Sequence, residues 1–217
     1  DNRLAWKAAN PAAELPAPLH IRLDEGASVE GAIDAAAASG AGIVLIDTPG
    51  SDTADSRAAH GRADLVVTPM NDSFVDFDLL GQVDPVTLEL LKPSIYSESV
   101  WEARKHRAIT EGRAAAIDWI VVVNRMAVAA ARNRQRLEER TEKLARRVGF
   151  RIGPGLRDRV IYRELFPFGL TVADLSNDVR PVAVSLAHVA ARQELRNLMQ
   201  ALGLDGGSLN APLDEAA

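Results

Sequence analysis

Residues 43–50, Ile-Val-Leu-Ile-Asp-Thr-Pro-Gly, place one acid directly after an apolar run. The run does not alternate and is rich in β-branched residues, which is typical of a strand buried on both faces of a parallel sheet. Asp47 then ends the strand at the edge of the sheet where ligands bind, and a carboxylate there commonly holds Mg²⁺ beside a nucleotide phosphate. Gly50, after Thr48 and Pro49, turns the chain and can bring its N–H close to a phosphate. The alternative is an acid that merely ends a buried strand.

Two other stretches carry groups that could bind a ligand. Asn124 follows the apolar run 119–123, and its amide could pair with the edge of an adenine; the alternative is an ordinary N-cap for the next helix. In residues 151–175 a Gly-Pro-Gly loop leads to Arg159, Tyr162 and Arg163, and its alternative is a loop held by aromatic packing. The four histidines lack metal-ligand spacing, so we expect surface or capping roles for them.

Charge is distributed unevenly along the chain. Residues 24–89 hold thirteen acids and two bases, whereas residues 125–163 hold twelve bases and four acids. Such asymmetry predicts a basic surface for a polyanion, and the long helix expected over 125–148 would align bases three and four residues apart. The alternative is a solvated helix face on which Glu138, Glu139 and Glu142 form i, i+4 ion pairs with the bases. We favour DNA, with contacts from Arg132, Arg136, Arg140, Lys143 and Arg147, and with Arg157, Arg159 and Arg163 next in line.

Composition limits the classes of protein that remain. The chain has 217 residues, of which 47% are hydrophobic and 25% charged, so it can bury the core of one domain. It contains no cysteine, which excludes disulfides, thiol catalysis and cysteine-ligated clusters. No apolar run is long enough to cross a bilayer, and no leader opens the chain, so we expect a soluble, cytoplasmic protein without membrane contact.

Candidate strands and helices alternate along the chain. Strands are predicted at 19–23, 43–47, 65–69, 119–123 and 150–153, and helices at 1–9, after Ser28, from Phe74 to Val83, and at 95–108, 125–148 and 185–202. Alternation of this kind predicts an α/β fold with a mostly parallel sheet and helices on both faces. We expect one domain over residues 1–204 and a disordered tail over 205–217.

Several segments together resemble the MipZ family of ParA/MinD-type ATPases, which are P-loop NTPases that place the division plane. The segments are "IVLIDTPG", "VTPMNDSFVDFDLLGQVD", "VWEARKHRA", "IDWIVVVNR" and "RVGFRIGPGLRDRVIYRELFPFGLTVADL". They occur in order across the chain. The resemblance implies an ATP-bound homodimer that associates with the nucleoid, binds double-stranded DNA without sequence preference, is recruited by ParB and inhibits polymerisation of FtsZ.

The chain departs from this family pattern at its start. Members open with a strand and a glycine-rich loop, K-G-G-x-x-K-[ST], and this sequence contains no such loop. The absent first strand, P-loop and first helix amount to a βαβ unit of roughly 30 or more residues. We therefore expect the chain as written to be inactive and to need that unit for ATP and Mg²⁺.

The resemblance also assigns roles to residues of this chain. Asp47 would act at the catalytic site and hold Mg²⁺ through water, and Thr48, Pro49 and Gly50 would sense the γ-phosphate. Asn124 would read adenine with help from Pro154, Gly155 and Leu156. Two alternatives remain: a general ParA-type partition ATPase, and a non-enzymatic module that kept a surface for FtsZ or ParB and lost nucleotide binding.

Overall fold

A computed structural model describes the protein at residues 2–11, 13, 15–24, 26–71, 76, 78–84, 87, 90–112, 117–126, 131–176, 179 and 181–204; it leaves undescribed the side chains of residues 83, 131–138 and 140. The predicted tail over 205–217 lies outside this range. Among the described helices, none combines the length and apolar character that a membrane span requires.

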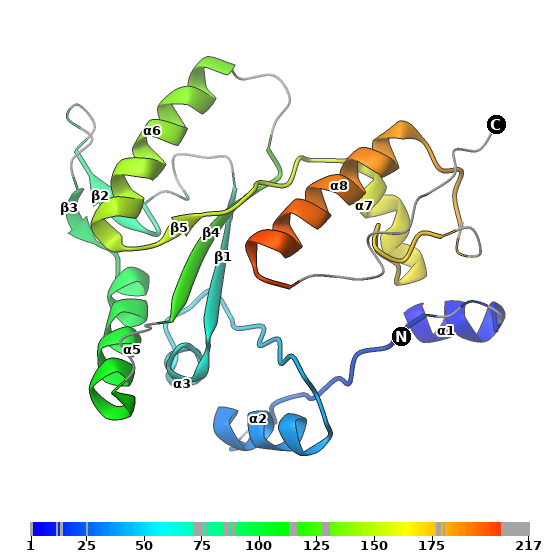
Figure 1. Ribbon diagram of the computed structural model, residues 1–217, viewed down its shortest axis with the longest axis horizontal. Helices are drawn as coiled ribbons and strands as arrows, with labels where there is room; N and C mark the ends of the chain where they lie inside the picture. The colour runs from blue at the N-terminus through cyan, green and yellow to red at the C-terminus, as the bar shows by residue number, and fades with distance from the viewer. Residues whose placement is uncertain are drawn as a thin grey trace.

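Three parallel strands form the centre of the molecule (Figure 1): β1 (Leu65–Asn71), β4 (Asp118–Asn124) and β5 (Arg151–Ile152), in the order β1-β4-β5. β1 pairs with β4 along its whole length, from Leu65 opposite Asp118 to Asn71 opposite Asn124. Helix α5 (Ile95–Glu111) precedes β4, and α6 (Ala131–Val148) connects β4 to β5. The predicted α/β fold, a parallel sheet flanked by helices, is therefore confirmed.

The main core lies where β4 meets α5 and α6. Residues 119–122 of β4 are all buried, which agrees with their unbroken apolar sequence. Full burial of one such side chain stabilises the fold by roughly 1.5–3 kcal/mol. The cluster on this side contains Val66, Met70, Leu80, Val100, Ile117, Trp119, Val121, Leu144, Ala145, Val148 and Phe150.

A polar and aromatic network joins four elements inside this core. The indole Nε1 of Trp119 donates to Thr68 Oγ1 at 2.9 Å, and the same oxygen lies 2.6 Å from the hydroxyl of Tyr96. The ring of Tyr96 meets His60 of α3 (Ala54–Arg62) edge-on at 5.4 Å. Because Thr68 satisfies both buried groups, β1, β4 and α5 share one hydrogen-bonded contact.

A second cluster surrounds the C-terminal helices. Helix α1 (Asn2–Ala9) packs on the 3₁₀ helix η1 (Phe166–Phe168), near α7 (Val160–Leu165) and α8 (Leu186–Ala201). Arg3 bonds both carboxylate oxygens of Asp174, at 2.7 and 2.8 Å. Gly169 has a φ of +64°, and a Cβ there would lie 2.2 Å from the backbone nitrogen of Arg3. Only glycine therefore lets α1 come this close.

The predicted helix start after Ser28 is confirmed, and the helix predicted at 185–202 is present as α8, whose serine cap the sequence analysis did not name. Ser28 caps α2 (Val29–Ala38) by accepting the N–H of Gly31 at 3.0 Å. Ser185 caps α8, and the ring of His188 completes a reciprocal contact with the backbone of Ser185. These side chains satisfy amide groups that the first helical turn leaves without an intrahelical partner.

The helix predicted from Phe74 to Val83 is wrong at its end. Gly81–Val83 form strand β2, which pairs antiparallel with β3 (Leu90–Pro93). A Cβ at Gly81 would lie 2.7 Å from Leu90 Cδ1 and 3.1 Å from the carbonyl oxygen of Lys92. The close pairing with β3, a partner later in the chain, overrides the local helical pattern.

Two predicted strands are also absent. Residues 19–23 and 43–47 form neither helix nor strand, and their apolar side chains are exposed, with Leu45 reaching 91%. A strand with one apolar face, as 19–23 would have, or two, as 43–46 would have, is stable only when neighbouring strands pair with it and other elements cover its apolar side chains. The described residues supply neither neighbour, so both segments run extended over the surface.

Burial of His60 makes stability depend on pH. Burial lowers the pKa of His60, and the nearby Asp52 opposes this effect only in part. As the pH falls below about 6.5, the unfolded chain therefore binds a proton at His60 more readily than the folded chain does. The free energy of unfolding consequently decreases as the pH falls below that value. His188 acts in the same direction, because burial also lowers its pKa.

We expect His60→Gln to lose less stability than the parent chain between about pH 7.5 and pH 5.5, by at most about 1.4 kcal/mol per pH unit. Urea unfolding at both pH values measures this difference. Equal pH dependence in the His60→Gln variant and the parent would contradict the contribution of His60.

Candidate functional site

The carboxyl ends of β1 and β4 form the edge where an open α/β sheet binds ligands. Asn71 and Asn124 end the two strands directly opposite each other. Asn71 donates through its backbone N–H and its side-chain amide to Asp76 Oδ2, at 2.8 Å each. Its amide nitrogen is therefore engaged within the chain, and Asn124 is the better candidate for an external ligand.

Asn124 is held by its neighbour. Its Oδ1 accepts the backbone N–H of Arg125 at 2.9 Å, which orients the amide and leaves its nitrogen without a partner among the described residues. Arg125 has a φ of +53°, an uncommon conformation for a residue with a Cβ. Such strain persists where the surrounding structure imposes it, often at binding sites. No sequence signal at Arg125 predicts this conformation.

The loop at Pro154–Leu156 lies directly beside Asn124. Leu156 donates its N–H to the carbonyl of Val123 at 2.8 Å, and Met126 donates to Leu156 at 3.0 Å. A Cβ on Gly155 would lie 3.0 Å from the oxygen of Val123. The structure thus brings together the residues to which the resemblance assigned the adenine. Their role in reading the base stays a prediction.

Asp47 and residues 48–50 do not belong to a strand of the described sheet. Asp47, Pro49 and Gly50 are exposed and Thr48 is half-buried, on the extended segment that follows the unpaired apolar run. Because 43–47 is not a strand of the described sheet, the sheet does not position Asp47. Its assignment to Mg²⁺ stays a prediction that depends on this segment joining a sheet.

Glu194 of α8 accepts hydrogen bonds from the two arginines that follow the loop, Arg157 and Arg159. Arg159 donates to it from Nη2 at 2.6 Å and from Nε at 3.2 Å, and the backbone N–H of Arg157 donates at 3.3 Å. Burial disfavours the charged form of Glu194, but these bonds outweigh burial and lower its pKa. Glu194 lies 35 residues from Arg159, and no local pattern in the sequence links the two.

The bases predicted to contact DNA fall into three groups. Arg159 is largely buried against Glu194, whereas Arg157 and Arg163 are exposed and pair with Glu194 and Asp158, respectively. Lys143 and Arg147 of α6 are exposed and form no ion pair with a described residue. The side chains of Arg132, Arg136 and Arg140 lie outside the described residues, so the basic face of α6 stays a prediction.

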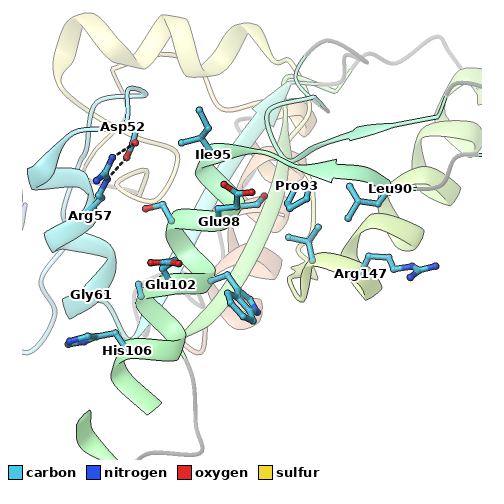
Figure 2. Close-up of a pocket in the computed structure, with 15 residues that line it drawn as sticks. Asp52, Arg57, Gly61, Leu90, Pro93, Ile95, Glu98, Glu102, His106 and Arg147 are labelled. Atoms are coloured by element: carbon cyan, nitrogen blue, oxygen red, sulfur yellow. Dashed lines mark hydrogen bonds and ion pairs between the residues drawn. The ribbon is translucent and has the colours of Figure 1, made fainter. Parts of the chain in front are cut away.

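A groove of about 820 Å³ lies over the outer face of α5 (Figure 2). Asp52 and Arg57 form an ion pair on the side of α3, and Arg147 of α6 stands on the opposite side. Two acids of α5, Glu98 and Glu102, lie between them, and the exposed Trp101 also lines the groove. The residues that line this groove include none from the carboxyl edge of the sheet, so the groove is separate from the candidate ligand site.

Comparison with known proteins identifies one family. A sequence model of that family, described as ATPase MipZ, matches residues 1–206. A search of curated proteins finds no match. The matched range includes Asp47, Asn124, the loop at 154–156 and the basic part of α6.

The close contact between the loop and β4 can be tested at Gly153. A Cβ there would lie 2.6 Å from Ile120 Cδ1 and 3.1 Å from Val122 Cγ2, inside the packed core. We expect Gly153→Ala to lower the free energy of unfolding by about 1–3 kcal/mol through overpacking. Urea unfolding measures it.

Gly61→Ala is the matched control, because no atom lies within 4 Å of a Cβ there and the residue is helical. It should leave stability unchanged or raise it by up to about 1 kcal/mol. If Gly153→Ala were as stable as the parent, the loop would not approach β4 as closely as described.

Proposed function

The chain belongs to the MipZ family of ATPases, and from this membership we propose that it places the division site as an ATP-dependent dimer. The dimer binds double-stranded DNA without sequence preference, is recruited by ParB and inhibits polymerisation of FtsZ. The observation that carries the proposal is the family match over residues 1–206, which covers nearly the whole chain.

The donor set at the carboxyl edge fits the base of a nucleotide. An adenine needs a donor and an acceptor in one plane, and the amide of Asn124 together with backbone groups of 154–156 can offer both. Leu156 is bonded to Val123 and Met126, and Asn124 Oδ1 accepts from Arg125, so both groups are held in place before a flat ring binds. ATP would bind here through its base, and Mg²⁺ bound at Asp47 would supply neutralisation of phosphate charge.

The phosphate half of the site needs a further unit. The family places a glycine-rich loop after its first strand, and this sequence has no such loop. Among the described strands, β1 pairs only with β4, so its other edge is open. We infer that the first strand of such a unit pairs with this edge and that residues 43–47 then join the sheet. Asp47 would thereby reach the phosphates.

DNA binding is proposed for the outer face of α6. Lys143 and Arg147 are exposed there, four residues apart and therefore on one side of the helix. Together with Arg132, Arg136 and Arg140 they would follow phosphates without reading bases. Dimerisation would double the number of contacts and raise affinity for any duplex.

The enzymatic part of the proposal is tested in an extended chain, in which a glycine-rich phosphate-binding unit of the same family precedes residue 1. We expect the extended chain to hydrolyse ATP with Mg²⁺, and residues 1–217 alone to bind ATP negligibly because they lack the phosphate-binding loop. Asp47→Ala in the extended chain should remove most turnover while the fold survives. Steady-state phosphate release and circular dichroism measure both.

Asp55→Ala is the matched control for this substitution, since Asp55 is an exposed acid nearby on α3. It should retain turnover. Full activity of a folded Asp47→Ala variant would refute the assignment of Asp47. An inactive extended chain that still inhibits FtsZ assembly would favour the non-enzymatic module instead.

For DNA, we expect the double substitution Lys143→Ala with Arg147→Ala to weaken binding by the ATP-bound extended chain equally on unrelated duplexes. Each phosphate that the double variant no longer neutralises should flatten the slope of log affinity against log salt by about 0.9. Titrations at several salt concentrations measure the slope. Arg151→Ala is the control, because Arg151 already pairs with Asp118 at 2.7 Å. An unchanged slope in the double variant would place the DNA surface elsewhere.

A further inference from the structure

Glu194 of α8 contacts both arginines that follow the loop at Pro154–Leu156. Arg159 approaches it with two nitrogens, and Arg157 contributes its backbone N–H and its guanidinium, whose Nε lies 3.6 Å from Glu194 Oε1. The side chains of Arg159 and Glu194 are each 17% exposed, so water competes little for this contact. Paired N–H donors on one carboxylate fix orientation as well as distance.

Helix α8 is a rigid support for this carboxylate. Ala191, one turn before Glu194, is fully buried in the second cluster, and Leu195 packs against the same cluster. Arg192 donates to the carbonyl of Leu175 at 2.7 Å inside the protein. Because the helix is anchored on several sides, Glu194 cannot follow the loop if the loop moves.

The opposite side of the loop is anchored on β4. Leu156 donates its N–H to Val123 of β4 and accepts the N–H of Met126, just after that strand, and Asp158 donates its N–H to the carbonyl of Met126 at 3.2 Å. Residues 156–159 therefore lie between two fixed surfaces, β4 and α8. Asn124 belongs to the first of these surfaces and Glu194 to the second.

We propose that Glu194 is the positioning residue of the base-binding loop: it holds Arg157 and Arg159, and through them sets the distance of Pro154–Leu156 from Asn124. This inference rests on the proposed binding of ATP at this edge. Without Glu194 the loop has bonds to β4 alone and spends part of its time away from the base. Apparent affinity falls by the same factor as the fraction of time in the competent position.

The test uses Glu194→Gln, which keeps the size of the side chain and removes its charge. In the chain of residues 1–217, amide exchange at Leu156 and Arg157 should quicken relative to Val121 within β4. In the extended chain, a loop that is in place for about one-tenth of the time weakens ATP about tenfold. The preference for ATP over GTP should fall with it, because the base is no longer held against Asn124.

Asp174→Asn is the matched control, since Asp174 also binds one arginine through two oxygens, and that arginine is Arg3 of α1 rather than a residue of the loop. It should lower stability and leave the ATP/GTP preference unchanged. Asn124→Ala in the extended chain should lower both affinity and preference. Should Glu194→Gln unfold, Arg159→Lys carries the same test, because it keeps the charge and loses the two-nitrogen contact.

The possible failures are separable. If the extended parent chain binds no ATP, the proposed function fails and this inference with it. If the parent binds ATP and Asn124→Ala weakens it, but Glu194→Gln leaves affinity and preference unchanged, the positioning role alone is refuted. An equal loss of preference in Asp174→Asn would also refute it, because the effect would then reflect general stability.

Discussion

The ladder between β1 and β4 is the interaction on which the rest of the structure depends. Its register sets Asn71 opposite Asn124 and so creates the edge at which a ligand can bind. The same ladder places Trp119 beside Thr68, which then satisfies the hydroxyl of Tyr96 and draws α5 onto the sheet. A slip of one residue would turn the buried side chains of β4 to the opposite face and remove both contacts.

The open edge of β1 explains the apolar surface of the described chain. Residues 43–46 have the sequence of a central strand, yet they are exposed, and the same holds for Leu19, Ile21 and Leu23. Backbone groups of a strand need a partner at each edge, and apolar side chains alone cannot supply one. Pairing at β1 therefore decides whether these segments belong to the sheet, and with them whether Asp47 belongs to the site.

Ion pairs within the fold reduce the number of basic side chains that are available to bind DNA. Of the bases in the C-terminal part, Arg151, Arg157, Arg159 and Arg163 have acidic partners in the fold. These four arginines therefore have structural roles, although from the sequence alone they could equally be expected to contact DNA. Among the described side chains of α6, Lys143 and Arg147 remain available to solvent, which concentrates the candidate surface for DNA on the outer face of one helix.

The sequence by itself determined the α/β class, the central strands predicted at 65–69 and 119–123, the serine-capped start of α2 and the helix predicted at 185–202. It could do so because these signals are local: unbroken apolar runs, helical periodicity and capping side chains act within a few residues. It also determined the family, through segments in a fixed order. Tertiary structure alone decided that 81–83 is a strand, that 19–23 and 43–47 are not, and that Glu194 holds Arg157 and Arg159. Each of these depends on a partner distant in the chain, whose presence or absence no local pattern can report.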